Sequence, residues 1–178
     1  PSYDMVQRLM TEVIGSREDS QAALHWNGFY YVRFQQQLYR VAKADYLASP
    51  LENKSAALHF QMEQSVSLAS GNFQIQCSPM GLSTELLNQP LTLSPRVGGE
   101  KIHLYGRIGS WPLKKAIQQA QIFPWQRHTI QILSRDNVML GVFTPQGFWL
   151  AQSDYCTKSG WLPTLSLNAK TAISDLQS

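Results

Sequence analysis

The sequence lacks the clustered cysteines and histidines that metal sites and disulfide scaffolds need. Its 178 residues include two cysteines, Cys77 and Cys156, and four histidines that lie far apart in the chain. None of them has metal-ligand spacing, so the sequence predicts neither a zinc site nor a disulfide framework. We expect reduced thiols, as in a cytoplasmic protein.

The common catalytic motifs are also missing. There is no H-E-x-x-H pair and no G-x-S-x-G elbow. The glycines of Gly98-Gly99-Glu100-Lys101 and of Gly106–Ser110 lack the P-loop spacing that ends in Gly-Lys-Ser/Thr, and they are more typical of turns. The acidic pair Glu18-Asp19 lies in an expected solvated loop. The sequence therefore predicts no catalytic residue and no metal ligand.

Long apolar runs and targeting segments are absent as well. No stretch approaches the roughly 18 apolar residues of a membrane-spanning helix, and no signal-peptide pattern is present. We therefore expect no membrane partner. The chain opens on Pro1 rather than Met, and we expect it to be a piece of a longer protein.

What the sequence does have is a local concentration of positive charge. Between Arg96 and Arg135 lie seven of the fifteen Lys/Arg residues and a single acid, Glu100, so this window carries +6. The remainder has eight basic and eleven acidic residues and carries −3. Such clustering indicates a polyanionic partner, nucleic acid in particular. The alternative is a set of ordinary solvated lysines on loops and helix faces.

The first fifty residues predict one helix and a three-stranded meander. Ser2 is a favourable N-cap, and apolar residues recur at helical spacing over residues 3–14 until Gly15. Asn27-Gly28 is the preferred two-residue turn of a hairpin. Strands are expected at residues 23–26, 29–34 and 37–42. A unit this small has too little core to stand alone, so we expect it to be the end of a larger domain.

Residues 43–56 are expected to form a linker, and the chain beyond them is predicted to be β-rich. Strands are expected at residues 58–68, 72–76, 91–93, 101–105, 129–133, 138–143, 148–152 and 162–167. A helix over residues 111–121 has one apolar face, formed by Leu113, Ala116, Ile117 and Ala120. The fold class predicted is α+β: a short helix plus a β-meander, then a β-rich domain with one or two helices packed on its sheet.

Two regions of the sequence resemble one known family. The first runs from Pro1-Ser2-Tyr3-Asp4 through Arg17-Glu18-Asp19 to the hairpin around Trp26-Asn27-Gly28 and the segment 33–39. The second is an ordered set of matches, comprising Leu93, Arg96, Gly98 or Gly99, Lys101, Gly106, Arg107, Leu113-Lys114-Lys115, Pro124-Trp125, Arg127 and Gly141-Val142-Phe143. Both resemble the part of bacterial tRNA(Ile)-lysidine synthetase that is C-terminal to its catalytic domain.

The resemblance implies a ligase fragment. The family uses ATP and Mg²⁺ to activate the wobble cytidine of an isoleucine tRNA with a CAU anticodon, and then attaches lysine. That chemistry belongs to an N-terminal domain with an S-G-G-x-D-S loop, which this sequence does not contain. By analogy, residues 1–50 would end the helical substrate-binding domain, and residues 51–178 would form the C-terminal tRNA-binding domain, on the acceptor-stem side.

The sequence departs from the family pattern at two places. Glu100-Lys101 stands where the family has Asp-Arg, and a lysine cannot make the bidentate contact of an arginine. His128 stands where the family has Asp, and the proline that follows is absent. These departures concern the finer details of recognition rather than the family.

The residues expected to contact tRNA are those of the basic window and one adjoining tryptophan: Arg96, Lys101, Arg107, Trp111, Lys114, Lys115 and Arg127. A tryptophan at either end of the helix can stack on a base or anchor the helix to the sheet. Anchoring is favoured for Trp125, and neither role is favoured for Trp111. Two alternatives remain open: an RNA-binding module without enzymatic function, and a protein-interaction domain whose basic patch meets an acidic partner.

Overall fold

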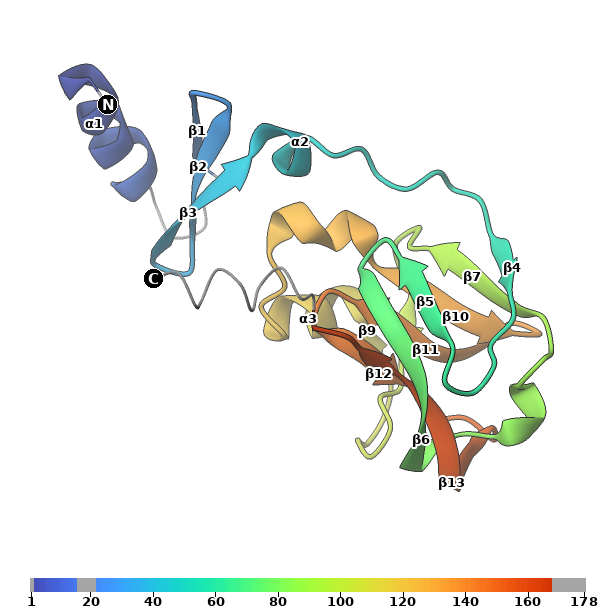
Figure 1. Ribbon diagram of the computed structural model, residues 1–178. Coiled ribbons are helices and arrows are strands. Elements are labelled where there is room, and N and C mark those ends of the chain that lie inside the picture. Colours follow the sequence, from blue (N-terminus) through green and yellow to red (C-terminus); the bar gives the residue numbers. More distant parts are fainter. Residues whose placement is uncertain (1, 16–21, 168–178) are drawn as a thin grey trace. The chain divides into compact units, whose positions relative to one another are not determined.

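The computed structural model describes residues 2–15 and 22–167 (Figure 1). The charged loop predicted around residues 16–20 and the end of the chain from residue 168 lie outside the described residues. By its internal contacts the chain divides into two compact units. The first comprises Pro1–Ser49 with Phe123–Trp125, and the second comprises Pro50–Ile122 with Gln126–Ser178.

The first unit begins with the predicted helix, which changes its pitch midway. It consists of α1 (Tyr3–Arg8) and a π-helical continuation, η1 (Leu9–Ile14). The Ser2 hydroxyl accepts a hydrogen bond from the backbone N–H of Met5 at 3.3 Å, so the predicted N-cap is confirmed. A π-helix has a wider turn than an α-helix, because its hydrogen bonds join residues five apart. The Gly15 N–H makes such a bond to Met10 O at 3.0 Å.

The predicted meander follows. Strands β1 (Ala23–Trp26), β2 (Phe29–Phe34) and β3 (Gln37–Ala42) form one antiparallel sheet. The turn residues Asn27 and Gly28 both have positive φ, 51° and 80°, as a tight hairpin turn requires. A short helix, α2 (Lys43–Tyr46), stands where only a linker was predicted.

The second unit contains two larger antiparallel sheets. One has the order β12-β11-β10-β7-β4, and the other has the order β13-β6-β5. The strands of the first are β4 (Ala56–Leu58), β7 (Leu91–Pro95), β10 (Gln131–Arg135), β11 (Val138–Thr144) and β12 (Gly147–Leu150). Those of the second are β5 (Ser65–Leu68), β6 (Gly71–Leu82) and β13 (Cys156–Leu165).

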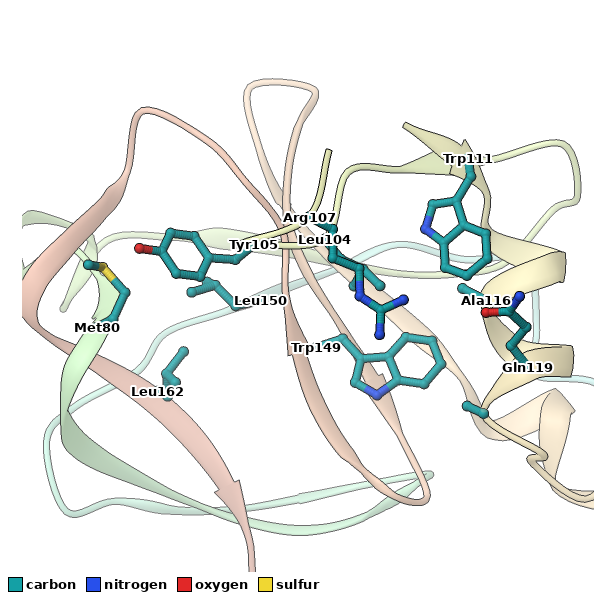
Figure 2. Close-up of a pocket in the computed structure, with 11 residues that line it drawn as sticks. Met80, Leu104, Tyr105, Arg107, Trp111, Ala116, Gln119, Trp149, Leu150 and Leu162 are labelled. Atoms are coloured by element: carbon teal, nitrogen blue, oxygen red, sulfur yellow. The ribbon is translucent and has the colours of Figure 1, made fainter. Parts of the chain in front are cut away.

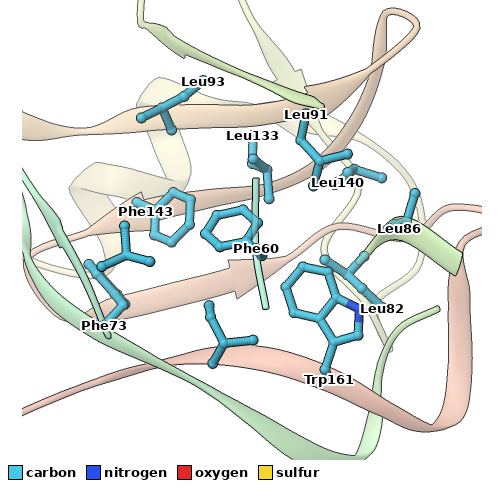
Figure 3. Close-up of a cluster of buried hydrophobic side chains, with 12 residues drawn as sticks. Phe60, Phe73, Leu82, Leu86, Leu91, Leu93, Leu133, Leu140, Phe143 and Trp161 are labelled. Atoms are coloured by element: carbon cyan, nitrogen blue, oxygen red, sulfur yellow. The ribbon is translucent and has the colours of Figure 1, made fainter. Parts of the chain in front are cut away.

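The larger core lies where these two sheets face each other (Figure 3). β6 and β13 contribute Phe73, Ile75 and Trp161, while β10 and β11 contribute Leu133 and Phe143. All five side chains have no solvent-accessible surface. Burial of so much apolar surface is the main force that holds the sheets together.

A second core covers the opposite face of the five-stranded sheet. Alternation along the strands sends Ile132 and Val142 to this side, where they meet α3 (Leu113–Gln119). From the helix, Leu113, Ala116 and Ile117 are buried, as its apolar periodicity predicted. The α+β class is therefore confirmed, with one helix on the sheet.

Several predicted element boundaries are wrong. The strand expected at 58–68 is two strands, β4 and β5, because Glu63 adopts φ 61° and interrupts the extended backbone. Of the strand expected at 101–105, Lys101–Ile102 forms β8 and Leu104 makes a single bridge to Ala151. β8 pairs with Trp111–Pro112 (β9), which was predicted as helix. β13 begins six residues before the strand expected at 162–167.

Candidate nucleic-acid interface

Three lysines lie on adjoining segments where the β8–β9 ribbon leads into α3. Lys101 pairs with Pro112 across the ribbon, and the N–H of Leu113 donates to Glu100 O at 2.9 Å, so the helix begins beside β8. Lys114 and Lys115 occupy the first turn of the helix and are exposed, as is Lys101. The fold thus gathers three ammonium groups onto two adjoining segments, although 13 to 14 residues separate them in sequence.

Arg107 is carried by a loop of residues 103–110 that is anchored to the end of β12. Backbone bonds join Tyr105 N–H to Leu150 O, 2.9 Å, and Gln152 N–H to His103 O, 2.7 Å. The His103 ring reaches back to the Arg107 carbonyl, with Nε2 at 2.7 Å. A carbonyl oxygen only accepts, so Nε2 carries the proton. The loop is therefore held at several points, while the Arg107 side chain remains exposed.

Arg107 and Trp111 share a cavity of about 470 Å³ (Figure 2). The guanidinium carbon of Arg107 lies 5.9 Å from the centre of the Trp111 ring, within cation–π distance. Trp149 of β12 and Gln119 of α3 line the same space. Figure 2 shows the guanidinium reaching between the two indoles, with the Gln119 amide beside them. The cavity combines flat aromatic faces with one cation and one amide.

Arg96 interacts with two other charged groups, the Glu100 carboxylate and the Arg127 guanidinium. Burial disfavours charge on the Glu100 carboxylate, but hydrogen bonds from backbone N–H groups and the positive charge of Arg96 outweigh it and lower its pKa. These bonds come from Val97, 2.5 Å, and Gly98, 2.9 Å. Burial, together with the charge of Arg96, lowers the pKa of Arg127. The two half-buried arginines therefore repel each other, and Arg96 also interacts with the Glu100 carboxylate.

Polar atoms around these arginines are left without partners. Among the described residues, Arg96 Nε, Glu100 Oε2 and Gln131 Oε1 are buried and make no hydrogen bond. Arg127 Nε, by contrast, donates to Ile122 O at 3.0 Å. Arg127 is thus fixed by the backbone, whereas Arg96 keeps unused hydrogen-bonding capacity.

The structure sorts the seven predicted residues into three groups. Lys101, Lys114 and Lys115 are exposed on adjoining segments, Arg107 and Trp111 line one cavity, and Arg96 and Arg127 are half-buried and repel each other. Trp125, the tryptophan that follows α3 in the sequence, stacks face to face on Phe123 with ring centres 4.8 Å apart. Both belong to the segment that groups with the first unit.

Three further residues contribute to the site and were not predicted from the sequence: Trp149, His103 and Gln119. Trp149 had a usable signal, because Phe148 and Trp149 alternate along a strand and only one of them can face the larger core. Phe148 packs there, so Trp149 faces the α3 side. The contact of His103 with Arg107 had no sequence signal, since it depends on how the loop folds.

We find neither a metal-binding group nor a membrane-spanning helix among the described residues. In the part of the chain that the structure describes, no group of three or more His, Cys, Asp or Glu residues is placed to hold a metal ion. Within the same residues, no helix has the length and apolar character needed to cross a membrane.

Glu100→Gln is expected to destabilise the second unit by about 1 kcal/mol at neutral pH, because a neutral amide accepts the two backbone bonds less well than a carboxylate. The folded-state pKa is lowered, so this stabilisation is present above the ordinary value of 4.5 and is lost as pH falls through the lowered pKa. Urea unfolding at neutral pH and well below pH 4.5 measures it. In acid, the wild type and Glu100→Gln should have the same free energy of unfolding. Glu85 is exposed, so Glu85→Gln should match the wild type at both pH values.

Comparisons with known proteins agree on one family. Residues 91–159 match the family model described as "TilS substrate C-terminal domain". The chain is 63% identical over 166 residues to the tRNA(Ile)-lysidine synthase of Acinetobacter baylyi, which covers 93% of this chain and 36% of that protein. It is 28% identical over 157 residues to the tRNA(Ile)-lysidine synthase of Serratia proteamaculans, covering 83% and 35%.

The chain therefore spans about a third of the length of these relatives. A solved structure described as "Crystal structure of TILS C-terminal domain" aligns with a TM-score of 0.44 at 15% identity, covering 65% of this chain and 100% of that chain.

Proposed function

Because residues 91–159 belong to the TilS substrate C-terminal domain family, we propose that this chain is the tRNA-binding portion of a tRNA(Ile)-lysidine synthetase. The whole enzyme would attach lysine to the wobble cytidine of the CAU-anticodon isoleucine tRNA in the cytoplasm. ATP and Mg²⁺ would be held by an N-terminal catalytic domain, since this sequence has no pyrophosphate loop. The role of this chain is to hold the tRNA, on its acceptor-stem side.

The observation that carries the proposal is the grouping of exposed cations on the second unit. Lys101, Lys114 and Lys115 lie on adjoining segments, and Glu100 is the only acid in the window of residues 96–135. Lysine ammonium groups bind phosphate as point charges and fix the position of a nucleic acid. A surface of this kind suits the phosphate backbone of an RNA helix, whose deep major groove side chains cannot read.

The half-buried arginines add to this proposal. The charge of Arg96 acts both on the Arg127 guanidinium and on the Glu100 carboxylate. A phosphate beside them would offset their repulsion and could accept a bond from the unpartnered Nε of Arg96. We therefore keep both arginines in the proposed tRNA site, in which Arg127 is held in place by the backbone.

The proposal is tested by titrating the transcribed isoleucine tRNA with this chain at several salt concentrations. Four to six phosphate contacts predict that log K falls with log[salt] at a slope of roughly −3 to −5. A protein-interaction domain with a basic patch is the second candidate, and polyglutamate of matched charge is its probe. Tighter binding of polyglutamate than of tRNA, or no tRNA binding at low salt, would contradict the proposal.

A further inference from the structure

We infer that the cavity between the loop 103–110, α3 and β12 accepts one unpaired nucleobase, held against the indole faces of Trp111 and Trp149. This inference rests on the proposed function, because it takes RNA as the partner of the second unit. It adds a site for a single base to a surface that otherwise meets phosphates.

The size and lining of the cavity fit a flat, mostly apolar ring. Its volume of about 470 Å³ lies within the range of roughly 300–1,000 Å³ typical of small-molecule sites. Trp111, Trp149 and Tyr105 supply aromatic walls, and Ala116 and Leu150 supply aliphatic ones. No acidic side chain lines it within the described residues, so nothing there repels a neighbouring phosphate.

The two indoles of the cavity wall pack against the second core on one side and are partly open to solvent on the other. Trp111 and Trp149 are half-buried, and Tyr105 keeps 38% of its surface exposed. The larger core is complete without them, because it is formed by side chains on the opposite face of the sheet. Half-exposed indoles that face one space are the stacking platforms of single-strand binders.

The two polar groups match the two polar parts of a nucleotide. The Gln119 amide offers both a donor and an acceptor and can pair with the hydrogen-bonding edge of a base. The Arg107 guanidinium lies 5.9 Å from the Trp111 ring and is exposed. From there it can stack on the base or contact the phosphate beside it. Its loop is fixed by the hydrogen bonds of Tyr105 and His103, which reduces the entropy lost on binding.

The base must come from a single-stranded part of the RNA. In a duplex the bases are stacked and paired, and a side chain cannot take one without paying to unstack it. In a tRNA the unpaired bases lie in its loops and at its 3′ end. Either source presents the same chemistry to the cavity, and the test below separates them.

The experiment measures binding of the isoleucine tRNA transcript to the wild-type chain and to variants at one salt concentration. Trp111→Ala and Trp149→Ala should each weaken binding by roughly 5- to 150-fold, the range for loss of one base stack. Trp111→Phe and Trp149→Phe keep an aromatic face and should retain most of the affinity. Gln118→Ala, exposed on α3 but outside the cavity lining, is the matched control and should bind as the wild type.

A second arm changes the RNA instead of the protein, so it does not depend on how the variants fold. Transcripts are compared that carry abasic residues at the unpaired 3′ end or, separately, in the loops. Loss of affinity in one of them identifies the source of the base, and Trp111→Ala should then remove the difference between intact and abasic RNA. The fluorescence of the wild-type tryptophans should be quenched by intact RNA and less by that abasic form.

The results distinguish a failure of the base-site inference from a failure of the proposed tRNA-binding function. If the tRNA binds and the lysine variants weaken it, but neither tryptophan variant nor any abasic RNA does, the base site is wrong and the proposed function stands. If the wild type binds no tRNA at low salt, both are overturned.

Discussion

Lys114→Ala/Lys115→Ala is expected to weaken binding of the isoleucine tRNA about 30-fold near physiological salt. Each lysine lost removes a phosphate contact worth about 1 kcal/mol, and two such contacts together correspond to roughly 30-fold in Kd. Each contact also releases condensed counterions, so the slope of log K against log[salt] should become less negative by about 1.4 to 1.8. Titration of wild type and variant over a range of salt measures both quantities.

The variant should fold, because neither lysine takes part in the core. Both side chains are exposed, while Leu113, Ala116 and Ile117 hold α3 on the sheet. Alanine also has the higher helix propensity of the two residue types. Circular dichroism and the unfolding midpoint should therefore match those of the wild type.

A matched control removes the same charge from another part of the second unit. Lys54 and Lys158 are exposed and lie outside the basic window, so Lys54→Ala/Lys158→Ala gives the same net charge as the test variant. We expect a loss of a few-fold at most, through the weakened long-range field. Equal losses in both double variants would mean that tRNA responds to net charge alone and that no localised site exists.

Local signals in the sequence predicted the parts of the fold that local geometry decides. Asn27-Gly28 predicted its hairpin because few residues tolerate positive φ at both turn positions. The spacing of Leu113, Ala116 and Ile117 predicted the buried face of α3, since a helix repeats every 3.6 residues. Ser2 predicted the start of the first helix through a bond to a neighbouring N–H.

Pairing between distant strands decided what the sequence could not predict. Residues 58–63 alternate as a strand does, yet Glu63 N–H bonds to Ile75 O and its positive φ turns the chain. From the sequence, the last strand was expected only at residues 162–167. β13 nevertheless begins at Cys156, because β6 pairs with it from Cys156 to Leu165, with an interruption at Ser159 (φ 54°) and a register shift at Trp161. Such contacts join residues about eighty positions apart, and no local pattern encodes them.

The same distinction between local sequence signals and tertiary contacts applies to the candidate site. The number and sign of its charges could be read from the sequence, and so could the exposure of Lys114 and Lys115. The approach of Arg96 to Arg127 could not, because it depends on the tertiary fold. The meeting of Trp111 with Trp149 required the loop and β12 to come together. Composition thus predicted what kind of partner to expect, and tertiary pairing determined the shape presented to it.

Trp161→Ala is expected to destabilise the second unit by about 3–5 kcal/mol, the usual cost of deleting a large buried aromatic side chain. Trp161 is completely buried in β13 and packs on Phe60, with ring centres 5.5 Å apart. Its indole N–H donates to Ser83 O at 2.8 Å, and that carbonyl would lose its partner. Since small domains are stable by only about 5–15 kcal/mol, the unfolding midpoint in urea should fall sharply.

Two further variants serve as comparisons. One separates the stability contributed by the apolar ring from that of its hydrogen bond, and the other measures the effect of removing a tryptophan outside this core. Trp161→Phe keeps most of the apolar contact and loses the bond to Ser83 O, so it should cost about 1–2 kcal/mol. Trp111→Ala removes a half-buried indole that lines the cavity, and its effect on stability should be smaller than that of Trp161→Ala. Unfolding followed by far-UV circular dichroism gives all three values, because that signal does not depend on the tryptophan removed. If Trp161→Ala proved no less stable than Trp111→Ala, the packing of the two sheets around Trp161 would be wrong.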